Sequence, residues 1–164
     1  MTQKNLYTVV MVRHGQSVAN LQNTYSGWDD VLLTEEGETN LLQSRYRYFI
    51  HKTLLVSICR LSHFTGVEQA RQAGKILRKA GYKFDVAHTS MLTRAQKTLD
   101  LILEELGQRD IPVHKTWRLN ERNFGEFTGL THAEVLEKFG SEKVSLRTLF
   151  SSCIAKSLQR KNVR

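Results

Sequence analysis

Cysteine is scarce in this sequence, and long apolar runs and a leader-like segment are missing from it. The two cysteines, Cys59 and Cys153, are too few for a disulfide framework and lack the spacing of metal ligands. No apolar run reaches the ~20 residues that a membrane-spanning helix needs. The polar start, Met1 to Asn5, does not have the pattern of a signal peptide. We therefore expect a cytoplasmic protein without a membrane partner, a metal or a disulfide scaffold.

Repeats and low-complexity linkers are also absent, and the length of 164 residues suits one domain. Apolar runs predict strands at 6–12, 84–89 and 111–113, the first two of them buried. Helical patterns predict a short helix near Ser17 and longer helices at 67–80, 90–106 and 131–139, with glycines 81, 107 and 140 as their stops. Another helix is expected to begin at Thr34, its N-cap. This alternation predicts an α/β fold with a mostly parallel sheet.

Positive charge is concentrated in two segments. The net charge is +8 for the whole chain, but segment 38–66 carries +3, segment 144–164 carries +5, and the remaining residues balance at zero. Both cysteines also fall in these two segments. An evolved nucleic-acid surface would be clustered on one folded face, so we expect no nucleic-acid partner, although a non-catalytic product with a nucleic-acid-binding tail remains an alternative.

The strongest chemical signal is Arg13-His14-Gly15, directly after the first expected strand. Ligands of open α/β sheets bind at such strand ends. The planar guanidinium of Arg13 matches phosphate oxygens, and Gly15 allows close backbone approach to a ligand. The pattern indicates an imidazole that attacks phosphorus while its neighbours hold the equatorial oxygens. Taken alone, it fits equally well a surface histidine at the end of a strand.

Several further motifs follow in order: RHGQSVAN (13–20), YSGWDD (25–30), LLTEEG (32–37), FDVAHTSMLTRAQKT (84–98) and PVHKTWRLNERNFGEFTGL (112–130). Together they resemble the cofactor-dependent phosphoglycerate mutases of the histidine phosphatase superfamily, over roughly residues 5–37 and 67–143. The RHG motif marks the superfamily, whereas WRLNERNFG points to the mutase branch. The resemblance implies a three-layer α/β/α fold that is incomplete at the C-terminus, with residues 1–143 as a partial domain.

The resemblance also implies a role for each matching residue. His14 would carry the phosphoryl group, and Arg13 and Arg94 would bind the transferring phosphate. Glu121 would be the general acid and base; nearby arginines lower the pKa of a carboxyl group, so burial has to counter them if Glu121 is to protonate a leaving group. Taken alone, Glu121 and Arg122 favour a local surface ion pair. The expected substrate-binding residues are Asn20, Ser26, Gly27, Arg122, Phe124 and His132.

Three positions depart from the pattern of the family. Phe124 stands where a tyrosine is usual, His132 where a substrate-binding lysine is usual, and Gln16 where a glutamate is common after RHG. The second catalytic histidine of the family, in a Gly-His-Gly type motif, has no counterpart in this sequence. These departures leave the substrate open but not the phosphohistidine chemistry.

The resemblance implies interconversion of 2-phosphoglycerate and 3-phosphoglycerate in glycolysis, primed by 2,3-bisphosphoglycerate and without a metal. The partner would be a small phosphorylated sugar acid, and intact members of the family can form homo-oligomers. The alternatives are a phosphatase of the same superfamily, in which water attacks the phosphohistidine, and a catalytically inactive truncated product.

Segments 38–66 and 144–164 share a possible origin. Gly37-Glu38 and Lys143-Val144-Ser145 can be encoded by splice-donor-like sequences, and Thr65-Gly66 by an acceptor-like one. We hypothesise a retained intron and intron read-through, which genomic reads showing ordinary exons would exclude. The alternatives are a surface helix pair at 38–66 and a solvated basic tail, expected to be disordered, at 144–164. An insertion at 38–66 has to loop out of the helix expected from Thr34 or break its packing, and we expect low stability.

Overall fold

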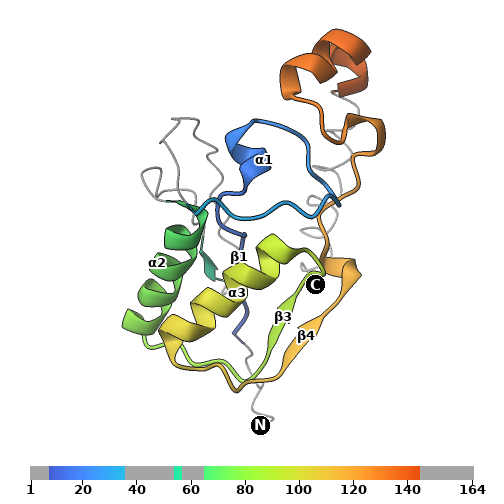
Figure 1. Ribbon diagram of the computed structural model, residues 1–164. Helices are drawn as coiled ribbons and strands as arrows, with labels where there is room; N and C mark the ends of the chain where they lie inside the picture. The colour runs from blue at the N-terminus through green and yellow to red at the C-terminus, as the bar shows by residue number, and fades with distance from the viewer. Residues whose placement is uncertain (1–7, 36–53, 57–64, 145–164) are drawn as a thin grey trace, which may run out of the picture.

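The computed structural model describes residues 8–35, 54–56 and 65–144. Most of segment 38–66 and nearly all of the expected disordered tail lie outside these residues. Two long helices, α2 (Gly66–Lys79) and α3 (Thr93–Leu106), lie side by side and cover the strands on one face (Figure 1). The fold is α/β with parallel strand pairing, as the sequence predicts.

Four short strands form two parallel pairs in the described part of the chain. β1 (Val10–Val12) pairs with β2 (Leu54–Val56), and β3 (Ala87–Thr89) pairs with β4 (Val113–Lys115). β1 and β3 fall inside the expected runs at 6–12 and 84–89 but are shorter, β4 overlaps the expected strand at 111–113 only at Val113, and β2 was not expected. Since β2 lies inside segment 38–66, the alternative of a surface helix pair is wrong for its three residues.

Helix α2 confirms its sequence pattern almost residue for residue. Ala70, Ala73, Gly74 and Leu77 are buried on one face, and Thr65 caps the helix in a capping box with Glu68. The helix expected to begin at Thr34 and to continue through Val67 lies mostly outside the described residues; Thr34 and Glu35 themselves are not helical.

Helix α3 begins three residues later than expected. The Ser90 hydroxyl accepts a hydrogen bond from the amide of Leu92, while the Asp30 carboxylate accepts one from the amide of Thr93 at 2.6 Å. The cap of α3 therefore comes from a loop 63 residues earlier in the chain, which a local sequence pattern cannot reveal. Gly107 ends the helix in the left-handed conformation, as predicted.

The short elements follow local capping rules. α1 (Val18–Leu21) is capped by Ser17 in a box with Asn20. Two 3-10 turns, η2 (Trp117–Leu119) and η3 (Gly125–Phe127), shape the loop after β4. Residues 132–144 are helical and start at the expected Thr131 cap, where Glu134 accepts the Thr131 amide at 2.8 Å. Gly140 takes the left-handed conformation of a helix stop (φ 75°), as predicted, although helical residues follow it to 144.

The core lies between the strands and the two long helices. Val10 and Val12 pack against a buried cluster of Ala73, Leu77 and Ile102. Val9 and Met11, on the opposite face of the strand, are about half exposed. The prediction that residues 6–12 form a fully buried strand is therefore wrong on that face. Among the described residues, no helix is both long and apolar enough to cross a membrane.

A separate cluster holds the 132–144 helix to the loop before it. Phe124, Phe127 and Val135 are buried together. Figure 1 shows this helix projecting away from α2 and α3. The loops that bear the motifs lie between the two clusters.

Candidate active site

His14 lies two residues beyond the end of β1, at the carboxyl end of the strand. Its Nδ1 is 2.7 Å from the carbonyl oxygen of Gly15. Because a carbonyl oxygen can only accept, Nδ1 carries the proton in this contact. The lone pair of the neutral ring is then on Nε2, which is the nitrogen left available for attack.

The surroundings of His14 favour this neutral ring. Burial lowers the pKa of His14 to about 4 from its ordinary 6.5, against the hydrogen bond with Gly15, which raises the pKa. The positive charges of Arg13 and Arg94 lower the pKa further. At neutral pH the imidazole is therefore uncharged and able to act as a nucleophile.

Arg94 is fully buried at the start of α3, with its side chain 0% exposed. Its guanidinium donates to the carbonyl oxygens of Asp29 at 2.9 Å and Gly27 at 2.8 Å. It also pairs with the Glu121 carboxylate at 3.0 Å. Its Nε–H is buried without a hydrogen-bond partner. An orphaned cationic donor of this kind is unusual in a folded protein and is suited to an anion.

Glu121 does not have the burial that its role as a general acid calls for. Its side chain is 39% exposed, because only one carboxylate oxygen is held, by Arg94. Its backbone is fixed more firmly than its side chain: the indole N–H of Trp28 donates to its carbonyl oxygen at 2.6 Å. The Glu121 carboxyl is therefore not buried and is open to water.

Gly15 is required by the fold at this point. A Cβ on Gly15 would collide with the backbone of Gly66, and a Cβ on Gly66 would collide with the carbonyl of Gln16. The amide of Gly15 donates to Thr98 at 3.1 Å, and that of Gln16 donates to Gln69 at 3.0 Å. The RHG turn is thus pressed against the start of α2 and tied to both helices. Sequence reasoning missed Thr98 and Gln69, which only the tertiary structure brings to the turn.

The other predicted pocket residues form an adjoining aromatic cluster. The guanidinium carbon of Arg122 lies 4.8 Å from the centroid of the Phe124 ring. The centroid of the Tyr25 ring lies 4.8 Å from that of Phe124 and 4.3 Å from that of His132. Gly27 joins this cluster to the site, since a Cβ there would touch Arg122 and Phe124. Sequence reasoning missed Tyr25, the centre of this cluster.

Two predicted residues have local structural contacts. Asn20 accepts hydrogen bonds from the backbone and hydroxyl of Ser17, and Ser26 is buried beside Gly27. Geometry thus brings together His14, Arg13, Arg94, Glu121 and Gly27, and it gives Asn20 a capping contact. Within the described ranges, no three His, Cys, Asp or Glu side chains gather as metal ligands.

Comparison with known families matches this geometry to one of them. The sequence profile of the histidine phosphatase superfamily (branch 1) matches residues 9–49 and 61–151. The chain belongs to the histidine phosphatase superfamily. The profile covers His14, Arg94 and Glu121, and its gap at 50–60 falls inside segment 38–66.

Solved structures with this fold include both mutases and phosphatases. α-Ribazole phosphatase from Shigella flexneri is 25% identical with a TM-score of 0.56, over 85% of this chain and 52% of its own. Phosphoglycerate mutase from Bacillus anthracis is 24% identical with a TM-score of 0.57, over 79% and 44%. Mycobacterial glucosyl-3-phosphoglycerate phosphatase is 24% identical with a TM-score of 0.56, over 84% and 49%. This histidine phosphatase chain spans about half the length of these proteins.

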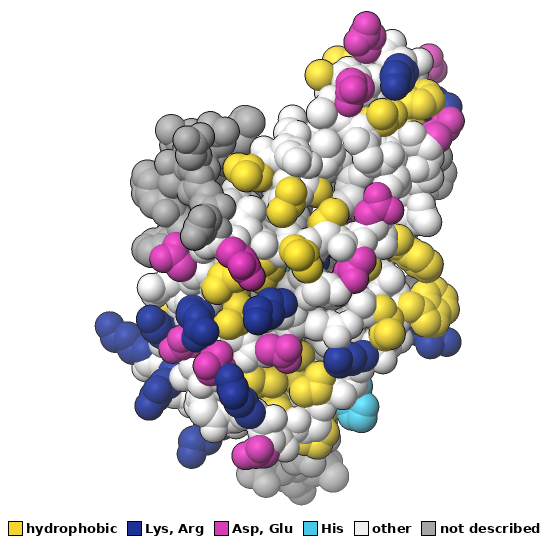
Figure 2. Space-filling view, in the orientation of Figure 1, with side chains coloured by type: hydrophobic (Ala, Val, Ile, Leu, Met, Phe, Trp, Pro, Cys, Tyr) yellow, Lys and Arg dark blue, Asp and Glu magenta, His cyan; other side chains and the backbone are white. Residues whose placement is uncertain are grey.

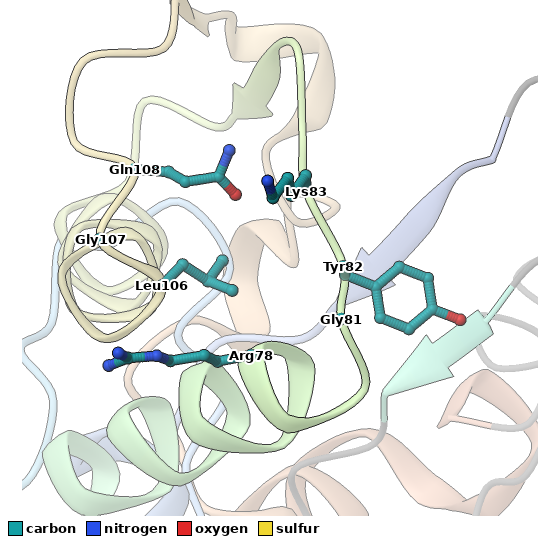
Figure 3. Close-up of a pocket in the computed structure, with 7 residues that line it drawn as sticks. All are labelled: Arg78, Gly81, Tyr82, Lys83, Leu106, Gly107 and Gln108. Atoms are coloured by element: carbon teal, nitrogen blue, oxygen red, sulfur yellow. The ribbon is translucent and has the colours of Figure 1, made fainter.

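A hollow elsewhere in this superfamily member has no catalytic character. It measures about 430 Å³ and lies where α2 and α3 end; Arg78, Gly81, Tyr82, Lys83, Leu106, Gly107 and Gln108 line it (Figure 3). The Gln108 amide is engaged with both backbone groups of Phe84, and Arg78 donates to the carbonyl of Glu105. Figure 3 shows the Tyr82 ring turned away from the hollow. The candidate site therefore remains at His14.

Proposed function

We propose that His14 accepts a phosphoryl group and passes it on, in the reaction that interconverts 2-phosphoglycerate and 3-phosphoglycerate. The observation that carries this proposal is a neutral imidazole that feels the charge of a buried guanidinium, one N–H of which has no hydrogen-bond partner. Burial keeps the pKa of His14 near 4, and the Nε–H of Arg94 lacks a partner. A nucleophile next to an anion-binding cation is what phosphoryl transfer requires.

The proposed step is balanced within the site. Nε2 of His14 forms a bond to phosphorus while the bond from phosphorus to the substrate oxygen breaks. Glu121, which is open to water, relays a proton from solvent to the departing oxygen, and Arg13 and Arg94 neutralise the transferring group. In the reverse step a hydroxyl of the bound acid attacks phosphorus, and Glu121 takes back the proton. The phosphoryl group then leaves His14 on the other oxygen.

The priming role of 2,3-bisphosphoglycerate is part of the same proposal. An anion of this kind fits the orphaned Nε–H of Arg94, and Arg13, Arg94 and Arg122 are the cations that would hold it. When bound, it supplies the first phosphoryl group to His14. The chain spans about half the length of its structural relatives. The labelling experiment below therefore also tests whether these residues suffice for phosphoryl transfer.

Hydrolysis is the second candidate, favoured by two observations. The Glu121 side chain is 39% exposed, so a water molecule can reach its carboxylate, which would activate that water for attack. Phe124 and His132 contact Tyr25, and neither offers the hydroxyl or the lysine that a mutase pocket would present to a sugar acid. Attack by water on the phosphohistidine would make the chain a phosphatase, like two of the relatives described above.

Labelling distinguishes these outcomes. The full chain and its variant His14→Ala are each incubated with 2,3-bisphosphoglycerate that carries labelled phosphate. The acid-labile, base-stable label bound to each protein is then measured. We expect label on the wild type and none on the variant. Isomerisation of added 3-phosphoglycerate supports the mutase, and release of labelled phosphate supports the phosphatase. Absence of label identifies a catalytically inactive product and overturns the proposal.

A further inference from the structure

Both tryptophans of the chain, Trp28 and Trp117, lie together in exposed loops. Their ring centroids are 6.4 Å apart with an angle of 59° between the planes, a usual geometry for an aromatic pair. They are 47% and 57% exposed. Figure 2 shows apolar side chains gathered at the right-hand edge of the molecule, where β4 runs into the following loop. We call these two indole rings the tryptophan pair.

The tryptophan pair is directly connected to the candidate active site. The indole N–H of Trp28 donates to the main-chain oxygen of Glu121 at 2.6 Å. The residue before Trp28 is Gly27, whose carbonyl oxygen accepts from Arg94 at 2.8 Å. One ring of the pair is therefore fixed next to two groups of the site. Its polar edge is satisfied, while much of its surface stays open to solvent.

Trp117 is also held in place. It begins η2, where the hydroxyl of Thr116 accepts from the amide of Arg118. The guanidinium of Arg118 lies 5.1 Å from the centroid of the Trp117 ring. Leu119 and Met91, both about half exposed, are further large apolar side chains of the nearby loops. The pair is thus an ordered aromatic surface with a cation beside it, rather than a single apolar side chain in water.

We infer that the tryptophan pair binds an aromatic ring on the alcohol part of a phosphomonoester whose phosphate lies at His14. This inference rests on the proposed function only for the position of the phosphate. Indole rings stack planar rings in offset or tilted arrangements, and Arg118 adds attraction for the electron-rich face of such a ring. A three-carbon acid has no ring to place on this surface, so the pair favours the larger, aromatic phosphomonoesters that the phosphatase alternative would hydrolyse and stays unused in the mutase reaction. It does not take part in the transfer step.

A matched pair of ligands tests the inference. Phenyl phosphate and cyclohexyl phosphate have the same charge and similar size, but only the first has an aromatic face. Each is titrated into the full chain while indole fluorescence is followed at the red edge of its absorption, where phenyl phosphate does not absorb. Since the chain has no other tryptophan, the signal comes from the pair alone. We expect phenyl phosphate to bind about tenfold more tightly, the usual size of one stacking contact.

Variants separate stacking from other causes. Trp28→Ala and Trp117→Ala should each remove most of the preference for the phenyl ester, whereas Trp28→Phe should keep part of it. Ile76→Ala, which truncates an exposed apolar side chain on α2, should leave the preference unchanged. Far-ultraviolet circular dichroism checks that each variant is folded. Equal affinities for the two esters, or a preference that survives both alanine variants, overturns the inference.

Failure of the proposed function gives a different result. His14→Ala abolishes covalent labelling but leaves the tryptophan pair in place, so the phenyl preference should persist in that variant. If the chain prefers the phenyl ester but never becomes labelled, the binding surface is supported and the proposed function is overturned. If the chain becomes labelled but binds the two esters equally, the proposed function is supported and the binding surface is overturned.

Discussion

The hydroxyl of Thr34 accepts a hydrogen bond from the amide of Gly66 at 2.8 Å, across 32 residues of sequence. The carbonyl oxygen of Thr34 also accepts from the amide of Val67 at 3.3 Å. Thr34 therefore stands at the start of α2 and helps to satisfy its first amides, although Thr65 is the N-cap in sequence.

This contact makes Thr34 a stabilising residue for α2. Thr34→Val keeps the shape of the side chain but leaves the buried amide of Gly66 without its acceptor and removes a bond to Gln16. We expect the free energy of unfolding to fall by about 1–2 kcal/mol. Urea denaturation measures the loss. Thr8→Val, at an exposed position, should stay within about 0.5 kcal/mol of the wild type; equal losses in the two variants would contradict the role of Thr34.

The sequence predicts those parts of the fold that depend on neighbouring residues. The buried face of α2, the Gly107 stop and the Thr131 cap all follow from side chains within one or two turns of each other. It does not predict the cap that Asp30 gives to α3, because that contact depends on tertiary structure. The exposure of Met11 also depends on which segments cover the second face of the strand, and its own sequence pattern cannot report this.

The same distinction applies to the candidate site. The resemblance implies that Arg94 and Glu121 lie near His14; the structure pairs Arg94 with Glu121, and the charge of Arg94 acts on the pKa of His14. The burial that its role calls for is not seen at Glu121, since burial depends on surrounding segments and not on the motif. Trp28 could have been noticed as an aromatic residue in a polar loop, but its contact with Glu121 could not.

Gly15 is predicted to be intolerant of any side chain. In Gly15→Ala the new Cβ would meet the carbonyl of Gly66, a backbone atom that cannot rotate away. We expect a loss of about 2–3 kcal/mol in the free energy of unfolding. Gly107→Ala is the comparison, because Gly107 has open space around it and only the cost of a left-handed conformation, about 1 kcal/mol. If thermal unfolding shows that Gly107→Ala lowers stability more than Gly15→Ala, the close packing of the RHG turn against α2 is contradicted.

Arg94 and Glu121 should differ sharply in their effects on stability. Arg94→Met removes the guanidinium that donates to the carbonyl oxygen of Gly27 and leaves that of Asp29 with only the amide of Val31 as a donor, so we expect a loss of about 2–4 kcal/mol. Glu121→Gln can still accept from Arg94 and is partly exposed, so its cost should stay below about 1 kcal/mol. Urea denaturation compares the two variants.

The same two variants should differ in chemistry as well. Glu121→Gln cannot donate the proton that the proposed transfer needs, so it should label far more slowly than the wild type while remaining folded. A stable Glu121→Gln variant with full labelling rate would remove Glu121 from the proposed mechanism. A stable Arg94→Met variant would instead contradict the buried contacts of the guanidinium.

The neutral state of His14 predicts how stability depends on pH. The unfolded chain protonates this imidazole below its ordinary pKa of 6.5, whereas burial holds the pKa of His14 in the folded chain to about 4. Between these values the unfolded state binds more protons, so His14 destabilises the fold as the pH falls from 6.5 to 4. The full effect is on the order of 3 kcal/mol.

The pH effect can be isolated by a difference between two proteins. Urea unfolding of the wild type and of His14→Asn is measured at neutral pH and near pH 4, and the loss in each is compared. Other groups titrate in both proteins, so their contributions cancel to first order. The wild type should lose about 3 kcal/mol more than the variant. His88→Asn, which removes an imidazole from an exposed strand, should retain the wild-type loss. Parallel losses in the wild type and His14→Asn would mean that the ring is not held neutral, and the nucleophile would then have to lose a proton before it could attack.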